Sequence, residues 1–266
     1  MTGLLLTFWT VMTIAETPTP AISLVIDDLG YVLGPGLRVA ALPGPVACSI
    51  LPHTPYAAPL AEAAHRAGKE VMLHLPMESQ DGMSLGPGGL LHTMSQTELS
   101  RILDADLALI PHVRGVNNHM GSLLTRQPVA MAWVMAEIKH HNHLFFIDSR
   151  TTPATVALDA AQKAGLSATR RDLFLDNTAQ PAAVRTQFAR LVALARVQGT
   201  ALGIAHPRPA TLQVLEEMLP RLSALGVRLT PVSAIVARRA AEPALLQAHN
   251  PYGPLPGVEG ILNIKK

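Results

Sequence analysis

The chain has 266 residues, of which 48% are hydrophobic, with 21 Lys and Arg residues against 19 Asp and Glu residues. This length and apolar content are enough for one large buried core. The charge is nearly balanced and the sequence has no basic run with interleaved aromatic residues, which excludes a typical nucleic-acid-binding protein.

The first segment, residues 1–20, contains an apolar stretch of about a dozen residues (LLLTFWTVMTIA) followed by the polar ETPTP. This stretch suits a signal peptide better than a membrane span, which needs roughly 20 apolar residues. The alternative is an ordinary apolar terminus, because no Lys or Arg precedes Arg38. We expect no stable transmembrane anchor and a periplasmic or secreted protein. The single Cys48 cannot form an intramolecular disulfide, and its apolar surroundings predict a small core residue.

After residue 20, short β-rich runs alternate with longer Ala- and Leu-rich stretches, which predicts a parallel sheet with crossover helices. Eight such strands allow a closed or nearly closed barrel. The strands are expected at 22–27, 46–51, 70–75, 113–118, 143–148, 167–175, 200–205 and 227–232. We assign residues 21–240 to one α/β domain and residues 241–266, which lack periodicity, to an extended or disordered tail.

Helices are expected between these strands, over 55–68, 95–110, 128–141, 181–199 and 210–226. The second of them opens with Ser95 and Glu98 at the spacing of a capping box. The Gly-rich segment 79–94 is too long for a tight connection and predicts a loop over one face of the domain.

Asp and His residues fall at the ends of the predicted strands. Asp27 and Asp28 close AISLVIDD, and the other strand ends carry His74 (EVMLH), Asp148 (HLFFID) and His206 (TALGIAH). Sites in parallel α/β folds gather at the carboxyl ends of the strands, so these side chains can converge. Their chemistry predicts a hydrolytic site that depends on a metal.

The Asp27 and Asp28 pair stands where a strand gives way to a loop, so a turn there can bring both carboxylates into one cleft. One could ligate a divalent cation while the other accepts a proton from water. The alternative is a helix cap and a solvated carboxylate. His74 is a candidate ligand, and Glu78 is a ligand or supporting partner only if the chain bends at Pro76.

The run Asn117-Asn118-His119 is unusual for a strand, since Asn is depleted there. We interpret His119 as a ligand and Asn118 as an orienting amide, against an Asx-type turn with a solvated His119. Asp148 either pairs with Arg150 or orients a catalytic His.

His206 is the candidate general acid, because imidazole titrates near neutral pH and can donate to a leaving amine. Asp172 and Asp176 are left outside the catalytic set, since Arg170 and Arg171 offer them simple partners. His140, His141 and His143 cluster at the end of a predicted helix and are interpreted as structural.

Taken together, VIDDLG, HLPME, NNHMGS, FIDSRT, RDLFLD and GIAHPRP resemble the divergent polysaccharide deacetylase family, a branch of the NodB-like carbohydrate esterases. The similarity spans about residues 21–236. It implies a distorted (β/α) barrel of seven to eight mostly parallel strands and a metal, usually zinc, at their carboxyl ends. By motif, it implies Asp27 as base, Asp28 and His74 as ligands, and His206 as acid.

The sequence departs from the mainstream pattern at two places. Glu78 stands where an H-x-x-x-H motif has its second His, and NNHMG replaces the usual Arg-Pro-Pro-Tyr region. We therefore infer that His119 completes the metal set, with Glu78 as the alternative.

The first functional hypothesis is hydrolysis of an N-acetyl or related acyl group on an envelope polysaccharide. The second is a non-catalytic envelope protein that binds glycan or protein through a relic cleft. The third is a metal hydrolase acting on another bond, although the lack of a Gly-rich phosphate cradle disfavours a phosphoester.

Overall fold

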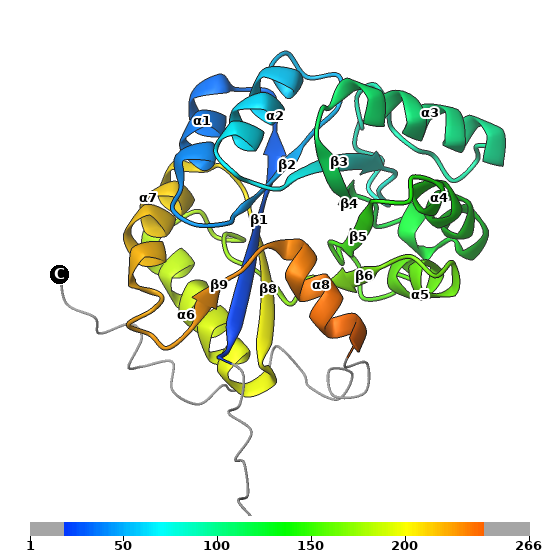
Figure 1. Ribbon diagram of the computed structural model, residues 1–266. Helices are drawn as coiled ribbons and strands as arrows, with labels where there is room; N and C mark the ends of the chain where they lie inside the picture. The colour runs from blue at the N-terminus through cyan, green and yellow to red at the C-terminus, as the bar shows by residue number, and fades with distance from the viewer. Residues whose placement is uncertain (1–18, 242–266) are drawn as a thin grey trace, which may run out of the picture.

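The computed structural model describes residues 19–241 (Figure 1). Residues 1–18 and 242–266 lie outside the described residues, and with them nearly all of the expected apolar N-terminal segment and C-terminal tail. Among the helices between residues 19 and 241, none has both the length and the apolar composition needed to cross a bilayer.

Nine strands form one sheet in this part of the chain, and every strand pair in it is parallel. The sheet order is β6-β5-β4-β3-β2-β1-β8-β7, and β9 pairs with the start of β1. The strands are β1 (Ala21–Leu29), β2 (Ala47–Ile50), β3 (Val71–Met77), β4 (Val113–Met120), β5 (Phe145–Asp148), β6 (Ala168–Arg170), β7 (Leu173–Phe174), β8 (Thr200–Ala205) and β9 (Arg228–Leu229).

The sheet curls so that its two end strands, β6 and β7, are consecutive segments of the chain. Only Arg171 and Asp172 separate them. The backbone N–H of Arg171 donates to Asp148 O in β5, and that of Asp172 donates to Leu202 O in β8, near the other end of the sheet order. The single strand predicted over 167–175 is therefore wrong: it is two short strands with different partners. The expected distorted (β/α) barrel is confirmed.

Helices surround the curled sheet (Figure 1). They are α1 (Leu33–Ala41), α2 (Ala57–Arg66), α3 (Gln96–Leu109), α4 (Pro128–His140), α5 (Ala157–Lys163), α6 (Pro181–Gln198), α7 (Pro209–Met218) and α8 (Val232–Ala241), with 3-10 turns η1 (Leu124–Arg126) and η2 (Leu219–Arg221). The predicted capping box is confirmed, since Ser95 and Glu98 exchange hydrogen bonds at the start of α3. Sequence analysis did not predict α1, α5 or α8.

Two proline residues shorten predicted elements. The helix expected over 210–226 ends as an α-helix at Met218 and continues as the 3-10 turn η2, because Pro220 has no N–H to donate. The strand expected over 227–232 ends at Leu229, and Pro231 precedes the first turn of α8. Segment 79–94 is the predicted loop, held to β3 by a hydrogen bond from Leu90 N to Pro76 O.

Alternate residues of each strand pack into two separate cores. One set faces the surrounding helices and includes the buried Cys48, as predicted. The other set fills the inside of the barrel and includes Val25, Met72 and Ile204. Helix α8 adds Val232 and Val236 to this inner cluster and contacts β1, β6 and β8, so it covers the amino ends of the strands. The carboxyl ends carry the polar side chains described next.

Candidate metal centre

A layer of polar side chains continues the inner core at the carboxyl ends of the strands. Side chains two residues apart on a strand share a face, so Asp27 follows Val25 and His74 follows Met72 toward the inside of the barrel. The same step leads from Ala47 to Ser49, from Gly115 to Asn117, from Ile147 to Ser149 and from Ile204 to His206. The site is therefore the polar last layer of an apolar barrel.

Asp28 reaches the same layer although strand alternation would turn it away from Asp27. Its φ is +58°, which few residues other than glycine adopt, and the pairing of β1 with β2 shifts register between Ile26 and Leu29. A left-handed residue at a strand end costs on the order of 1–3 kcal/mol and occurs preferentially at functional sites. The expectation that a turn brings both carboxylates into one cleft is met by this geometry.

Asp28, His74 and His119 form a compact group of three ligand atoms. Oδ1 of Asp28 lies 3.2 Å from Nε2 of His74 and 3.0 Å from Nδ1 of His119. The two imidazole nitrogens are 3.1 Å apart. The strand register explains the meeting, because β3 and β4 are neighbours with His74 opposite Asn117, two residues before His119.

The group fits a transition metal such as zinc. Ligand atoms bonded to one zinc ion at about 2.0–2.2 Å are roughly 3.0–3.6 Å apart, which is the spacing seen here. Oδ1 of Asp28 is buried and accepts no hydrogen bond, although an orphaned carboxylate oxygen is costly. Burial would raise the pKa of Asp28, but the imidazoles of His119 and His74 lower it well below its usual range.

The buried Asp27 stands beside this group. Its Oδ2 lies 3.7 Å from Nε2 of His74, and its Oδ1 accepts a hydrogen bond from Nδ2 of Asn117 at 2.9 Å. Burial raises the pKa of Asp27, against the opposing influence of His74, His206 and Asn117. The pKa of His74 is also raised: burial alone would lower it, but the carboxylates of Asp27 and Asp28 outweigh burial.

His206 approaches the group from the end of β8. Its Nε2 lies 3.8 Å from Oδ2 of Asp28, and its Nδ1 lies 3.0 Å from Oδ1 of Asp176. Burial would lower the pKa of His206, but the neighbouring Asp176 carboxylate raises it. Asp176 is fully buried and also accepts from the Thr211 hydroxyl at 2.8 Å. Sequence analysis left Asp176 outside the set because Arg170 and Arg171 were expected to pair with it.

Three predicted site residues, Glu78, Asp148 and Asn118, lie outside the ligand group. Glu78 accepts hydrogen bonds from the backbone N–H and, at 2.7 Å, the ring of His92 in loop 79–94, and it is not part of the ligand group. Asp148 accepts from Arg150 N and from the Thr155 hydroxyl within its own loop, so it orients neither His206 nor a ligand.

Asn118 ties the ends of β4 and β5 together. Its Oδ1 accepts from Ser149 N at 2.8 Å and its Nδ2 donates to Met120 O at 2.7 Å. The amide that contacts a ligand is that of Asn117, whose Oδ1 lies 3.2 Å from Nδ1 of His74.

Comparison with known proteins identifies the family. Residues 24–236 match the family described as divergent polysaccharide deacetylase. The chain belongs to this family. The uncharacterized protein YibQ of Escherichia coli strain K12 is 38% identical over 76% of this chain and 63% of its own length. An uncharacterized protein of Haemophilus influenzae is 34% identical over 76% of this chain and 71% of its own.

A solved structure has the same fold as this divergent polysaccharide deacetylase family member. An uncharacterized protein from Agrobacterium tumefaciens C58 superposes with a TM-score of 0.79 at 21% identity, covering 83% of this chain and 91% of that one. This likeness supports the fold. The match to the E. coli relative spans just under two thirds of that protein's length.

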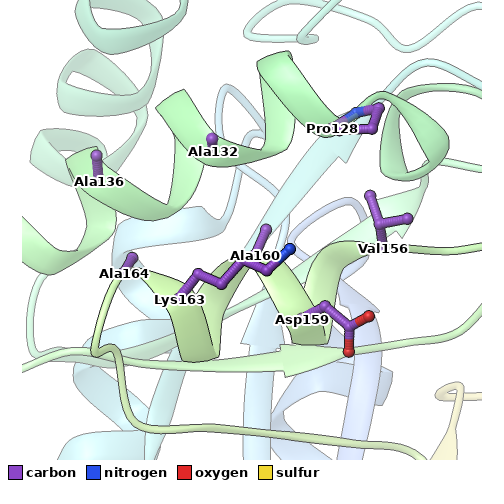
Figure 2. A pocket seen from close by; sticks show the side chains of 8 residues that line it. All are labelled: Pro128, Ala132, Ala136, Val156, Asp159, Ala160, Lys163 and Ala164. Atoms are coloured by element: carbon purple, nitrogen blue, oxygen red, sulfur yellow. The ribbon is translucent and has the colours of Figure 1, made fainter.

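Two other features of this family member lie away from the metal group. Glu137, His140 and His141 offer a second set of ligand atoms at the exposed end of α4. A groove of about 400 Å³ runs between α4 and α5 and is lined by alanines of both helices and by Pro128, Val156, Asp159 and Lys163 (Figure 2). None of the predicted site residues lines this groove.

Sequence analysis missed the polar residues that support the site in this family member: Ser49, Asn117, Ser149 and Asp176. The signal for three of them was available in the strand period, since each stands two residues after an inward-facing position. The fourth, Asp176, also stands two residues after an inward-facing residue, Phe174, but its expected pairing with Arg170 and Arg171 set it aside.

Proposed function

We propose that the protein is a metal-dependent hydrolase, with zinc as its metal, that removes N-acetyl or related acyl groups from an envelope polysaccharide in the periplasm or outside the cell. The observation that carries this proposal is the group of Asp28, His74 and His119 with Asp27 and His206 on its flanks. A ligand set flanked by a carboxylate and an imidazole suits metal-dependent amide hydrolysis.

The ligand residues would hold the metal through Oδ1 of Asp28, Nε2 of His74 and Nδ1 of His119. A bound divalent cation supplies Lewis acidity and lowers the pKa of water, which is worth several kcal/mol to the transition state. Because the protein would supply only three ligands, a coordination position would stay open for water or substrate, as in other catalytic sites.

Asp27 would serve as the general base. Its Oδ1 is held by the Asn117 amide at 2.9 Å, whereas its Oδ2 points toward the ligand group, 3.7 Å from Nε2 of His74. The raised pKa of Asp27, which results from burial, makes this carboxylate a better proton acceptor than an exposed one.

His206 would serve as the general acid. Asp176 holds its Nδ1 at 3.0 Å, so the proton on Nε2 is the one directed toward the ligand group. The raised pKa of His206 favours the imidazolium form, which would protonate the departing amine of the sugar.

The rim of the site supports a sugar as substrate. Tyr31 is 58% exposed and Tyr56 is 37% exposed, on the loops that follow β1 and β2. A hydrogen bond from Tyr56 N to Gly30 O at 2.9 Å ties these loops together next to Asp28. Exposed aromatic rings at a site offer flat apolar faces for the C–H faces of sugar rings.

The test is acetate release from chitooligosaccharides and from peptidoglycan fragments by the zinc-loaded protein. The matched control is the His206→Ala variant, which leaves the three ligands in place. We expect acetate from the wild type and none above background from the variant. Zinc binding without acetate release from either substrate would contradict the proposal and favour a glycan-binding protein with a relic cleft.

A further inference from the structure

We propose that Asn117 is a positioning residue that couples the base Asp27 to the metal ligand His74 through one buried amide. The roles of Asp27 and His74 in this inference rest on the proposed function, but the contacts do not. Asn117 is fully buried at the centre of the polar layer, on β4 opposite His74.

Every hydrogen-bonding position of the Asn117 amide is used. Its Nδ2 donates to Oδ1 of Asp27 at 2.9 Å and to Oγ of Ser149 at 3.1 Å. Its Oδ1 accepts from Oγ of Ser49 at 2.5 Å and faces Nδ1 of His74 at 3.2 Å. A side-chain amide has two donors and two acceptor positions, so this network is complete. Complete buried networks hold one arrangement of side chains.

The carboxylate determines which way the amide faces. Ionised Asp27 only accepts hydrogen bonds, so the NH₂ group of Asn117 must face it, and Oδ1 must then face His74. Nδ1 of His74 therefore carries a proton, which leaves Nε2, 3.2 Å from Oδ1 of Asp28, as the nitrogen on the side of the ligand group. The same amide thus selects the nitrogen that can ligate a metal and fixes the carboxylate that would accept a proton.

Ligating imidazoles usually donate their second N–H to a carboxylate or a carbonyl, and loss of that partner lowers metal affinity about 10- to 100-fold. In this chain the partner is an amide oxygen, whose nitrogen is committed to Asp27. Substitutions that keep the acceptor but lose the donor should therefore separate metal binding from turnover.

The experiment measures zinc affinity of the full chain by competition with a chromophoric chelator, together with acetate release. Asn117→Ala should bind zinc 10- to 100-fold more weakly. Asn117→Asp keeps an acceptor for His74 and Ser49, so it should bind zinc as the wild type does. It cannot donate to Asp27 and places a like charge beside it, so it should lose turnover.

Ser23→Ala is the matched control, because it removes a buried hydroxyl of β1 that donates to Thr230 O and leaves every contact of the Asn117 amide in place. It should keep both zinc affinity and turnover. If Asn117→Ala does not fold, Asn117→Ser replaces it: the hydroxyl is too short to bridge Asp27 and His74, and zinc affinity should fall as for alanine. Circular dichroism of the zinc-free variants identifies folded protein.

Wild-type zinc affinity in Asn117→Ala or Asn117→Ser, or a loss of zinc in Asn117→Asp as large as in Asn117→Ala, would overturn the coupling. If the wild type releases no acetate at all, the proposed function fails. The zinc affinities of the same variants still decide the role of Asn117 toward His74.

Discussion

His206 and Asp176 are joined by two hydrogen bonds, one through the ring and one through the backbone. Nδ1 of His206 lies 3.0 Å from Oδ1 of Asp176, and the backbone N–H of His206 donates to Oδ2 at 2.8 Å. Because one carboxylate holds both groups, the ring has little freedom to turn. The carboxylate also opposes burial and raises the pKa of His206. The carboxylate therefore extends the acid form of the imidazole to higher pH.

Replacing Asp176 by Asn should move the basic limb of the activity profile to lower pH. The neutral amide no longer stabilises the imidazolium, so the pKa of His206 falls and the general acid loses its proton earlier as pH rises. We expect a shift on the order of one pH unit in kcat/KM for acetylated chitooligosaccharides. Thr211→Val, which keeps the carboxylate, is the control. An unmoved basic limb would show that His206 is not the acid.

Metal content should separate the ligands from the flanking groups. Asp28→Ala removes the oxygen shared by both imidazole contacts, so the purified protein should lose its tightly bound zinc. His206→Ala should keep the zinc and lose turnover. Elemental analysis after dialysis checks both. Because Glu137, His140 and His141 form a second group of possible ligands, His140→Ala shows how much metal binds there.

Tyr31 should contribute to substrate binding rather than to chemistry. Tyr31 is 58% exposed on the loop that follows Asp28. Tyr31→Ala should raise KM roughly fivefold, the equivalent of about 1 kcal/mol of aromatic contact, with little change in kcat. Val129→Ala, an equally exposed apolar side chain on α4, is the control. A lower kcat at unchanged KM would count against a sugar-binding role.

The position of the site was predictable because polar residues interrupt apolar strands at their carboxyl ends, as Asp27 and His74 do. The choice among neighbouring residues needed the strand period as well. Ile147 faces the inside of the barrel, so the next inward position is Ser149, and Asp148 points the other way. The same argument favours Asn117 over Asn118. The period alone does not explain Asp28, whose positive φ returns it to the site.

The parts that could not be predicted depend on contacts between distant segments. The split of residues 167–175 into β6 and β7 follows from hydrogen bonds to opposite ends of a sheet whose curvature no local pattern records. Glu78 has the spacing of a mainstream ligand, but His92 from loop 79–94 holds its carboxylate. Local sequence predicts where such residues stand, whereas the partner that holds each one depends on the fold.

A buried carboxyl group away from the metal centre gives the protein a pH-dependent stability. Asp106 lies fully buried on α3, with Oδ1 2.9 Å from Nε2 of His53. Its Oδ2 is buried without a hydrogen bond, and Gly88 of loop 79–94 packs so closely that a Cβ there would lie 2.4 Å from Oδ1. Burial raises the pKa of Asp106 to about 7, although His53 opposes the shift.

The folded protein therefore holds this proton more tightly than the unfolded chain, where the pKa is close to 3.8. The stabilisation is complete below about pH 4 and is lost as pH rises to about 7, with an upper limit of about 4 kcal/mol. Asp106→Asn is neutral throughout, so its free energy of unfolding relative to the wild type should rise between pH 5 and pH 8 in urea titrations. Asp104→Asn, a more exposed carboxylate on the same helix, should follow the wild type. A constant difference for Asp106→Asn would mean that Asp106 is already ionised at pH 5.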